Sequence, residues 1–215
     1  MGKNVRLSST SKSSKKTLNT DKPLPRPLLT TESRLIGNRI PRDFFIAKGK
    51  GESEITVHAG SYHLALRDAR IERCNIITYS SILSGIAREI KRPETLVHGS
   101  VMETIMAVST AEKGKRATAA ITFGWLFDRK TGKKHGGLVC EYNGSLPEKE
   151  AIKQLRASLH EMYSNGYEEE FEMKNIASYS QSMLVKKKYG TVLVSLCWVN
   201  YVVPILGLET KSPEQ

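Results

Sequence analysis

The sequence predicts an α+β fold, in which β-sheet is covered by two helices that lie far apart along the chain. One observation is a nearly continuous apolar run over residues 117–127, which is typical of a strand buried on both faces. A second is a stripe of apolar residues at helical spacing after Ser145. A third is that strand-type segments stand before, between and after the two helical segments, which favours helices packed on sheet over a helical bundle.

Composition and charge divide the chain into a tail and a domain. The chain has 215 residues, enough for one domain with a core, and a net charge of +11. Residues 1–34 hold 8 Lys/Arg against 2 Asp/Glu, whereas the remaining residues hold 25 against 20. We expect a disordered Ser/Thr/Lys/Pro-rich tail over 1–34, a single domain over 35–208 and a C-terminal tail over 209–215. Because charge alone does not identify a partner, no specific nucleic acid is predicted.

Apolar runs and cysteines limit the compartment and the kinds of site. No run approaches the ~18 apolar residues that span a bilayer, so no membrane span is predicted. The three cysteines are widely spaced and form no CxxC pattern, which favours buried thiols in a cytoplasmic protein over disulfides. The five histidines show no metal-ligand spacing, so we expect no metal.

The first half of the domain predicts two strands around one helix. Residues 43–47 predict a strand, which we expect Gly49 and Gly51 to end. Ser61 is predicted to cap the helix. Residues 76–79 predict a short buried strand that ends at a pair of serines. The expected buried face of the helix consists of Tyr62, Ala65, Leu66 and Ala69.

The second half predicts further strands around a longer helix. Residues 95–109 predict a strand region with a break near Glu103, 113–116 a turn, 128–137 a loop and 138–142 another strand. A capping box of Ser145 and Glu148 begins the long helix, and Asn165–Gly166 ends it. Residues 171–183 and 190–203 predict two long strands joined as a hairpin. The stripe of the long helix consists of Ile152, Leu155, Leu159, Met162 and Tyr163.

Two local features could carry chemistry. Ser80 and Ser81 follow the strand that contains Asn75, and locally they fit either a polar turn or a reactive pair. Glu141 lies within the apolar strand 138–142. Burial there would raise its carboxyl pKa and let it act as an acid, whereas an outward position on an alternating strand would leave it solvated.

In their order along the chain, these segments resemble the pyruvoyl-dependent arginine decarboxylases over residues 41–201. The resemblance rests on the strand 44–49, the helix 64–69, the strand with its serines 75–82, and the segment 136–142 with the helix after it. It implies a four-layer α/β sandwich that assembles as a homo-trimer of αβ units, with active sites between protomers. It also implies that neither pyridoxal phosphate nor a metal is needed.

The resemblance further implies that the chain is a zymogen that cleaves itself between residues 80 and 81. The Ser81 hydroxyl attacks the carbonyl carbon of Ser80, and an N-to-O acyl shift turns the peptide bond into an ester. Elimination releases the chain that ends at Ser80. Hydrolysis, with loss of ammonia, then leaves a pyruvoyl group at position 81. Asn75 stands at the position of the family's processing asparagine.

The implied reaction converts L-arginine to agmatine and CO₂. The pyruvoyl group derived from Ser81 is the cofactor, and Glu141 stands at the position of the family's proton donor.

The chain departs from the family pattern at the expected substrate helix. His63 stands where family members carry an acid suited to a guanidinium, and Asp68 is a substitute on a slightly different face. Arg70 replaces a small residue, and the segment 83–85 after the serines lacks the usual prolines. Two alternatives follow: the same pyruvoyl chemistry on a different amino acid, or a scaffold relative that does not process itself.

Overall fold

A computed structural model of the chain describes residues 34–208. The described part is mostly strand with two α-helices, which confirms the α+β class. The predicted tails over 1–34 and 209–215 lie outside it, apart from Arg34. None of the helices in the described part is long and apolar enough to cross a membrane. All three cysteines have free thiols; Cys197 is buried, and Cys74 and Cys140 are half-buried.

The strands form three sheets. Five strands lie in the order β3-β6-β10-β2-β5, and four lie in the order β4-β8-β7-β9. The first sheet consists of β3 (Asn75–Thr78), β6 (Val101–Glu112), β10 (Tyr189–Val202), β2 (Ile40–Ser53) and β5 (Arg88–Glu89). The second sheet consists of β4 (Ile82–Ser84), β8 (Lys134–Gly144), β7 (Arg116–Asp128) and β9 (Phe171–Leu184). A separate two-stranded ladder pairs β1 (Arg34–Ile36) with β11 (Ile205–Leu208).

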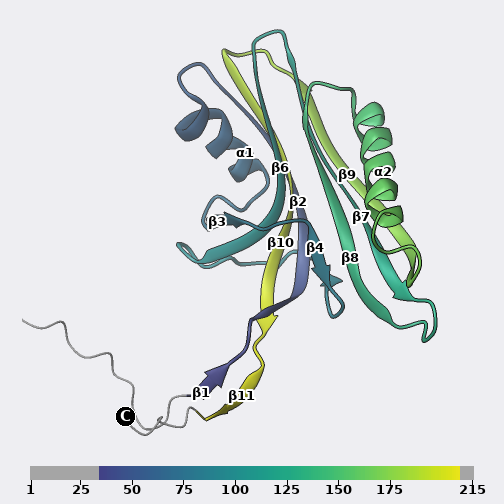
Figure 1. Cartoon of the computed structure of the whole chain (residues 1–215). Helices are drawn as coiled ribbons and strands as arrows, with labels where there is room; N and C mark the ends of the chain where they lie inside the picture. The colour runs from purple at the N-terminus through teal and green to yellow at the C-terminus, as the bar shows by residue number, and fades with distance from the viewer. Residues whose placement is uncertain (1–33, 209–215) are drawn as a thin grey trace, which may run out of the picture. The chain divides into compact units, whose positions relative to one another are not determined.

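The core is divided among the layers of the domain. Apolar side chains of the five-stranded and four-stranded sheets meet in one large cluster that includes Phe44, Ile105, Ile121 and Leu196. Helix α1 (His63–Asp68) covers the other face of the five-stranded sheet. Helix α2 (Glu148–Ser164) covers the outer face of the four-stranded sheet. Figure 1 shows this order of helix, sheet, sheet and helix. Strand β7 is buried along nearly its whole length, as its apolar sequence predicts.

The expectation that glycines end the first strand is wrong. Strand β2 runs through Gly49 and Gly51 to Ser53. A Cβ atom at Gly49 would lie 2.0 Å from the Ala65 carbonyl oxygen, and one at Gly51 would lie 2.4 Å from the Ser61 carbonyl oxygen. These glycines therefore let helix α1 and the segment before it approach the strand closely.

The start of the first helix also differs from the prediction. Ser61 is not its cap, because a π-helical segment (Val57–Tyr62) precedes α1 and no side chain caps either element. The Ser61 hydroxyl is buried and lies 2.8 Å from the Thr191 hydroxyl of β10. The predicted apolar face is correct, since Ala65, Leu66 and Ala69 are buried.

The second helix matches its stripe and its end but not its start. Leu155, Leu159 and Tyr163 are buried, and the helix ends at Ser164 with Asn165 as its C-cap. The capping box does not form, because Pro147 is the N-cap and no side chain caps it.

Three strand predictions need correction. Strand β6 continues through Glu103 without a break. The segments 171–183 and 190–203 are not a hairpin, because β9 pairs with β7 in one sheet and β10 pairs with β2 and β6 in the other. Strand β3 is not buried; it is an edge strand, paired only with β6, and most of its side chains are exposed. In each case a long-range contact decides the outcome.

Candidate active site

The serine pair lies where the chain crosses from one sheet to the other. The Tyr79 N–H donates to the Thr104 carbonyl of β6 in the five-stranded sheet, with a distance of 2.7 Å. Two residues later, the Ser81 carbonyl accepts from the Val139 N–H of β8 in the four-stranded sheet, at 3.0 Å. Ser80 is exposed, and Ser81 is half-buried. The bond between them is therefore the bridge between the two sheets.

Glu141 faces Ser81 from the middle of β8. It pairs across the sheet with Ile121, which is buried between the two sheets, so the Glu141 side chain lies on the same inner face. The Ser81 Oγ donates to the Glu141 carboxylate and lies 2.9 Å from both of its oxygens. Burial raises the pKa of the Glu141 carboxyl, and the hydrogen bond from Ser81 partly opposes that shift. The inward interpretation of Glu141 is therefore the one that the geometry supports.

Asn75 lies at the start of β3, away from the serine hydroxyls. Its side-chain Nδ2 donates to the Gly99 carbonyl at 2.9 Å, and its backbone N–H donates to the Ser100 carbonyl at 2.8 Å. These contacts fix the turn before β6 against the strand that leads to the serines. Within one chain, Asn75 thus positions backbone and does not contact Ser81.

His63 and Asp68 lie on α1, across the five-stranded sheet from Glu141. Both are exposed. The Asp68 Oδ2 accepts from the Lys50 N–H of β2 at 2.9 Å, so this carboxylate already holds backbone. The described chain therefore brings Ser81 and Glu141 together but leaves the two predicted substrate residues on the far side of a sheet.

Sequence reasoning misses a second buried acid near the serines. Glu103 is 2% exposed and forms an ion pair with Arg39. The signal is present, because Glu103 interrupts an apolar strand just as Glu141 does. The sequence prediction treats it as a strand break, whereas burial with a cationic partner explains it better.

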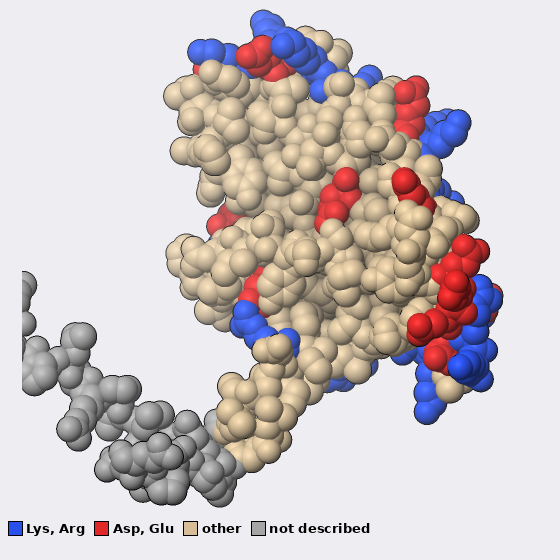
Figure 2. All heavy atoms as spheres, viewed as in Figure 1, with Lys and Arg blue, Asp and Glu red and all other residues tan. Residues whose placement is uncertain are grey.

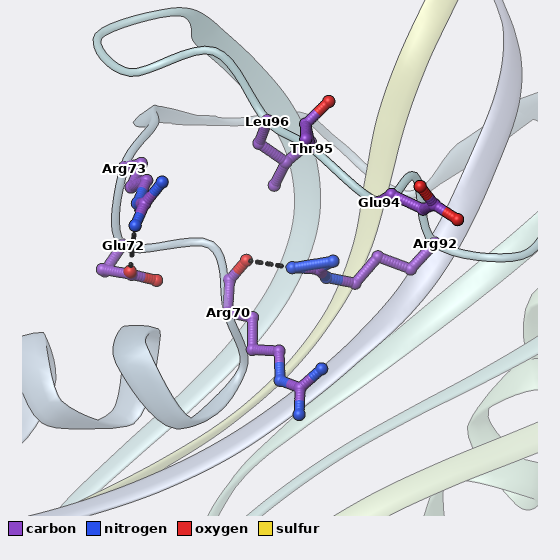
Figure 3. A pocket seen from close by; sticks show the side chains of 7 residues that line it. All are labelled: Arg70, Glu72, Arg73, Arg92, Glu94, Thr95 and Leu96. Atoms are coloured by element: carbon purple, nitrogen blue, oxygen red, sulfur yellow. Dashed lines mark hydrogen bonds and ion pairs between the residues drawn. The ribbon is translucent and has the colours of Figure 1, made fainter.

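A cavity at the C-terminal end of α1 is separate from this pair. It has a volume of about 260 Å³. Figure 3 shows that Arg92 reaches the Arg70 carbonyl there. Neither Ser81 nor Glu141 lines it. In the part of the chain that the structure describes, no three His, Cys, Asp or Glu side chains cluster as metal ligands. The cavity is lined by Arg70, Glu72, Arg73, Arg92, Glu94, Thr95 and Leu96.

Comparison with known proteins identifies the family. The family model described as pyruvoyl-dependent arginine decarboxylase matches residues 43–203. The chain belongs to this family. A pyruvoyl-dependent arginine decarboxylase from Chlamydia abortus is 30% identical over 187 residues, covering 77% of this chain and 94% of the relative. One from Chlamydia pneumoniae is 30% identical over 192 residues, with the same coverage.

A more partial match comes from a different lineage. A probable pyruvoyl-dependent arginine decarboxylase of Chloroherpeton thalassium is 30% identical over 133 residues, covering 56% of this chain and 70% of the relative. The region matched by the family model includes the serine pair, Glu141 and Glu103. The chain is thus a distant member of a family of lyases that use a pyruvoyl cofactor.

Proposed function

We propose that the chain is a self-processing decarboxylase that converts L-arginine to agmatine and CO₂, with a pyruvoyl group made from Ser81. The observation that carries the proposal is the hydrogen bond of the Ser81 hydroxyl to both Glu141 oxygens at 2.9 Å, in a member of this family. It brings together a nucleophile and a carboxyl group that are 60 residues apart in the sequence.

The residues around position 81 suit the pyruvoyl group. The carbonyl of residue 81 is already held by the Val139 N–H, and this carbonyl is retained when the serine is converted. When present, the group supplies a ketone that condenses with the substrate amine and draws off the electrons left by departing CO₂. Val139 and Glu141 would hold it from β8.

Glu141 is suited to move a proton in the reaction. Because burial raises the pKa of its carboxyl group, a larger fraction of that group is protonated near neutral pH than for a solvated glutamate. Its oxygens lie beside the Oγ position, so the proton would be delivered next to the reacting carbon. Before cleavage, the same carboxylate fixes the Ser81 hydroxyl in one direction.

Arginine is assigned as the substrate from the family. One observation, the residue at position 63, opposes this assignment. The exposed His63 cannot pair with a guanidinium as an acid would, which favours a second candidate, the same chemistry on a different amino acid. A scaffold that does not process itself is opposed by the intact pairing of Ser81 with Glu141.

Association of protomers is supported by the surface near the serines. Apolar side chains are exposed there: Ile77 is 48% exposed, Ile82 is 55% exposed and Val101 is 59% exposed. Figure 2, in the same view as Figure 1, shows that charges are sparse over the face with β3 and β4. Such a surface fits a protein–protein interface, and a homo-trimer of αβ units would cover it.

The deciding experiment is the mass of the purified chain under denaturing conditions. We expect two fragments, residues 1–80 and 81–215, the second blocked to N-terminal sequencing. The Ser81→Ala variant should remain intact, whereas Ser80→Ala, which keeps the attacking hydroxyl, should still cleave. An intact wild-type chain after prolonged incubation would contradict the proposal.

Release of CO₂ then settles the substrate. The cleaved protein should release CO₂ from L-arginine in preference to lysine, ornithine and histidine. Cleavage without release from arginine would reject arginine and favour the second candidate.

A further inference from the structure

Of the two carboxylate oxygens of the buried Glu103, only one has a partner in the described part of the chain. Glu103 lies on β6 on the same face as Ile105 and Ala107, which belong to the core between the sheets. Its side chain is 3% exposed, yet its Oε2 has no hydrogen-bond partner in the described part of the chain. The Trp198 Nε1, on the adjoining strand β10, also lacks a partner there. Buried polar atoms are nearly always satisfied, so both atoms point to an absent partner.

The occupied oxygen of Glu103 already binds a guanidinium. Arg39, just before β2, pairs with the Glu103 Oε1, although the Arg39 side chain is half-exposed. The Arg39 guanidinium carbon lies 5.0 Å from the centroid of the Tyr201 ring. A carboxylate and an aromatic ring beside the cation are the two features that recognise a guanidinium group. The pKa of Tyr201 is raised to about 12, mainly by burial and next by the neighbouring Tyr79, so its hydroxyl stays neutral.

This acid lies near the bond that is expected to break. Strand β3 pairs in parallel with β6, with Ile77 opposite Glu103. The Tyr79 N–H binds the Thr104 carbonyl, so residue 79 lies beside the residue that follows Glu103. From residue 79 to Ser81 the chain spans at most about 7 Å. An extended arginine side chain is of comparable length, so a substrate joined at position 81 would be long enough to reach as far as residue 79.

We propose that Glu103 and the Tyr201 ring form the site that recognises the guanidinium of the substrate, and that Arg39 occupies this site until the substrate displaces it. The inference rests on the proposed function. It gives Glu103 the role of the acid that the resemblance implies at position 63, where this chain has a histidine. Because the Arg39 side chain is half-exposed, it can move away from Glu103 without unfolding the core. The buried carboxylate then exchanges one guanidinium for another and is never left without a cation, which would be costly.

Kinetics of the cleaved enzyme test the substrate role. The Glu103→Gln variant should raise the KM for L-arginine about tenfold or more, with a smaller change in kcat, because a charged hydrogen bond to substrate is lost. It should also reduce the preference for arginine over citrulline, whose side chain is neutral. The control Glu172→Gln removes an exposed acid paired with Lys174 and should change neither value. An unchanged KM together with an unchanged arginine-to-citrulline ratio would overturn the inference.

Binding to the uncleaved chain gives a readout that needs no catalysis. Agmatine is titrated by calorimetry into the Ser81→Ala chain and into the same chain with Arg39→Met, which keeps the aliphatic stem. Removing the competing guanidinium should tighten agmatine binding about tenfold, and adding Glu103→Gln should abolish the gain. Equal agmatine affinity of the two chains, with and without the Arg39→Met substitution, would mean that the ion pair is purely structural.

The two tests separate failure of the inference from failure of the proposed function. A wild-type chain that does not cleave or release CO₂ rejects the proposed function, and the agmatine titration then decides the Glu103 site alone. If Glu103→Gln fails to fold, the Arg39→Met titration decides it. Normal turnover of arginine with unchanged binding in Arg39→Met rejects the Glu103 site and leaves the decarboxylase intact.

Discussion

Two regions of the molecule hold the residues that the family resemblance assigns to the reaction, and they differ in how far a single chain assembles them. Where β4 meets β8, Ser81 and Glu141 form a direct hydrogen bond, and burial shifts the carboxyl pKa. On α1, His63 is exposed and Asp68 is engaged with the backbone of β2. A single folded chain thus brings together the residues expected to make and break bonds. The residues of α1 do not by themselves form a site for the substrate.

The largest effect should come from Glu141. The Glu141→Gln variant should still cleave itself but should decarboxylate about 10²–10⁴-fold more slowly, because an amide cannot donate the proton that a carboxyl supplies. The checks are the denatured mass and the rate of CO₂ release. Glu150→Gln, which changes an exposed acid on α2, serves as the control. Undiminished turnover would remove Glu141 from the role of proton donor.

The next effect tests whether the α1 side is mechanically separate from the serine pair. Gly49→Ala should destabilise the fold by about 1–3 kcal/mol, because its Cβ would lie 2.0 Å from the Ala65 carbonyl oxygen and α1 must move. Self-cleavage of the folded fraction should continue at its normal rate. Urea unfolding measures the first and denatured mass the second.

The matched control for this glycine is Gly166→Ala. Apart from its two chain neighbours, no residue lies within 4 Å of a Cβ at that position, so stability should change by no more than about 0.5 kcal/mol. Loss of cleavage in folded Gly49→Ala protein would show that α1 and the serine pair are coupled.

A smaller pair of effects distinguishes the two candidate residues of α1. Asp68→Ala should cost about 1 kcal/mol, because the Lys50 N–H loses its acceptor. His63→Ala should stay within about 0.5 kcal/mol, since the imidazole is exposed. Thermal unfolding measures both.

Placing an acid at position 63, where the resemblance implies one, extends the comparison to substrate binding. His63→Asp should leave the KM for arginine within about twofold, as expected for an exposed charge when Glu103 provides the recognition. A markedly lower KM would return substrate recognition to α1.

The smallest effect concerns pH and has a definite sign. Because the pKa of Glu141 is raised in the folded chain, the folded state binds more protons than the unfolded state as pH rises above the ordinary carboxyl pKa. The stability contributed by this group is therefore present at low pH and is lost as pH rises through the raised pKa. Glu141→Gln should flatten this decline in urea unfolding, followed from acid to neutral pH. A decline of equal slope in the variant would assign it to other groups.

The parts of the fold that the sequence predicts well are those encoded by local periodicity. The buried strand β7 and the apolar stripe of α2 follow from the spacing of their own residues. Single residues at element ends are less informative. Ser61, Gly49 and Gly51 carry helix-cap and strand-end signals, but each is used for packing between β2, β10 and α1. Tertiary contacts outweigh such weak local preferences.

The candidate site divides in the same way. Sequence order is enough to single out Ser81 and Glu141 as a candidate pair, but their contact depends on strands in register across 60 residues. Glu103 shows the limit most clearly, because a lone acid in an apolar run looks the same whether it ends a strand or is buried against a cation. Burial and partner are properties of the assembled sheets.

The sequence alone establishes the α+β class, the family and the serine bond that is expected to break. The folded chain adds that β9 and β10 belong to different sheets, that Ser81 bridges those sheets, and that the buried Glu103 pairs with the guanidinium of Arg39. The physical reason is range. Periodicity and turn chemistry act over a few neighbouring residues, whereas burial, hydrogen-bond partners and pKa values are set by side chains that folding brings together from distant strands.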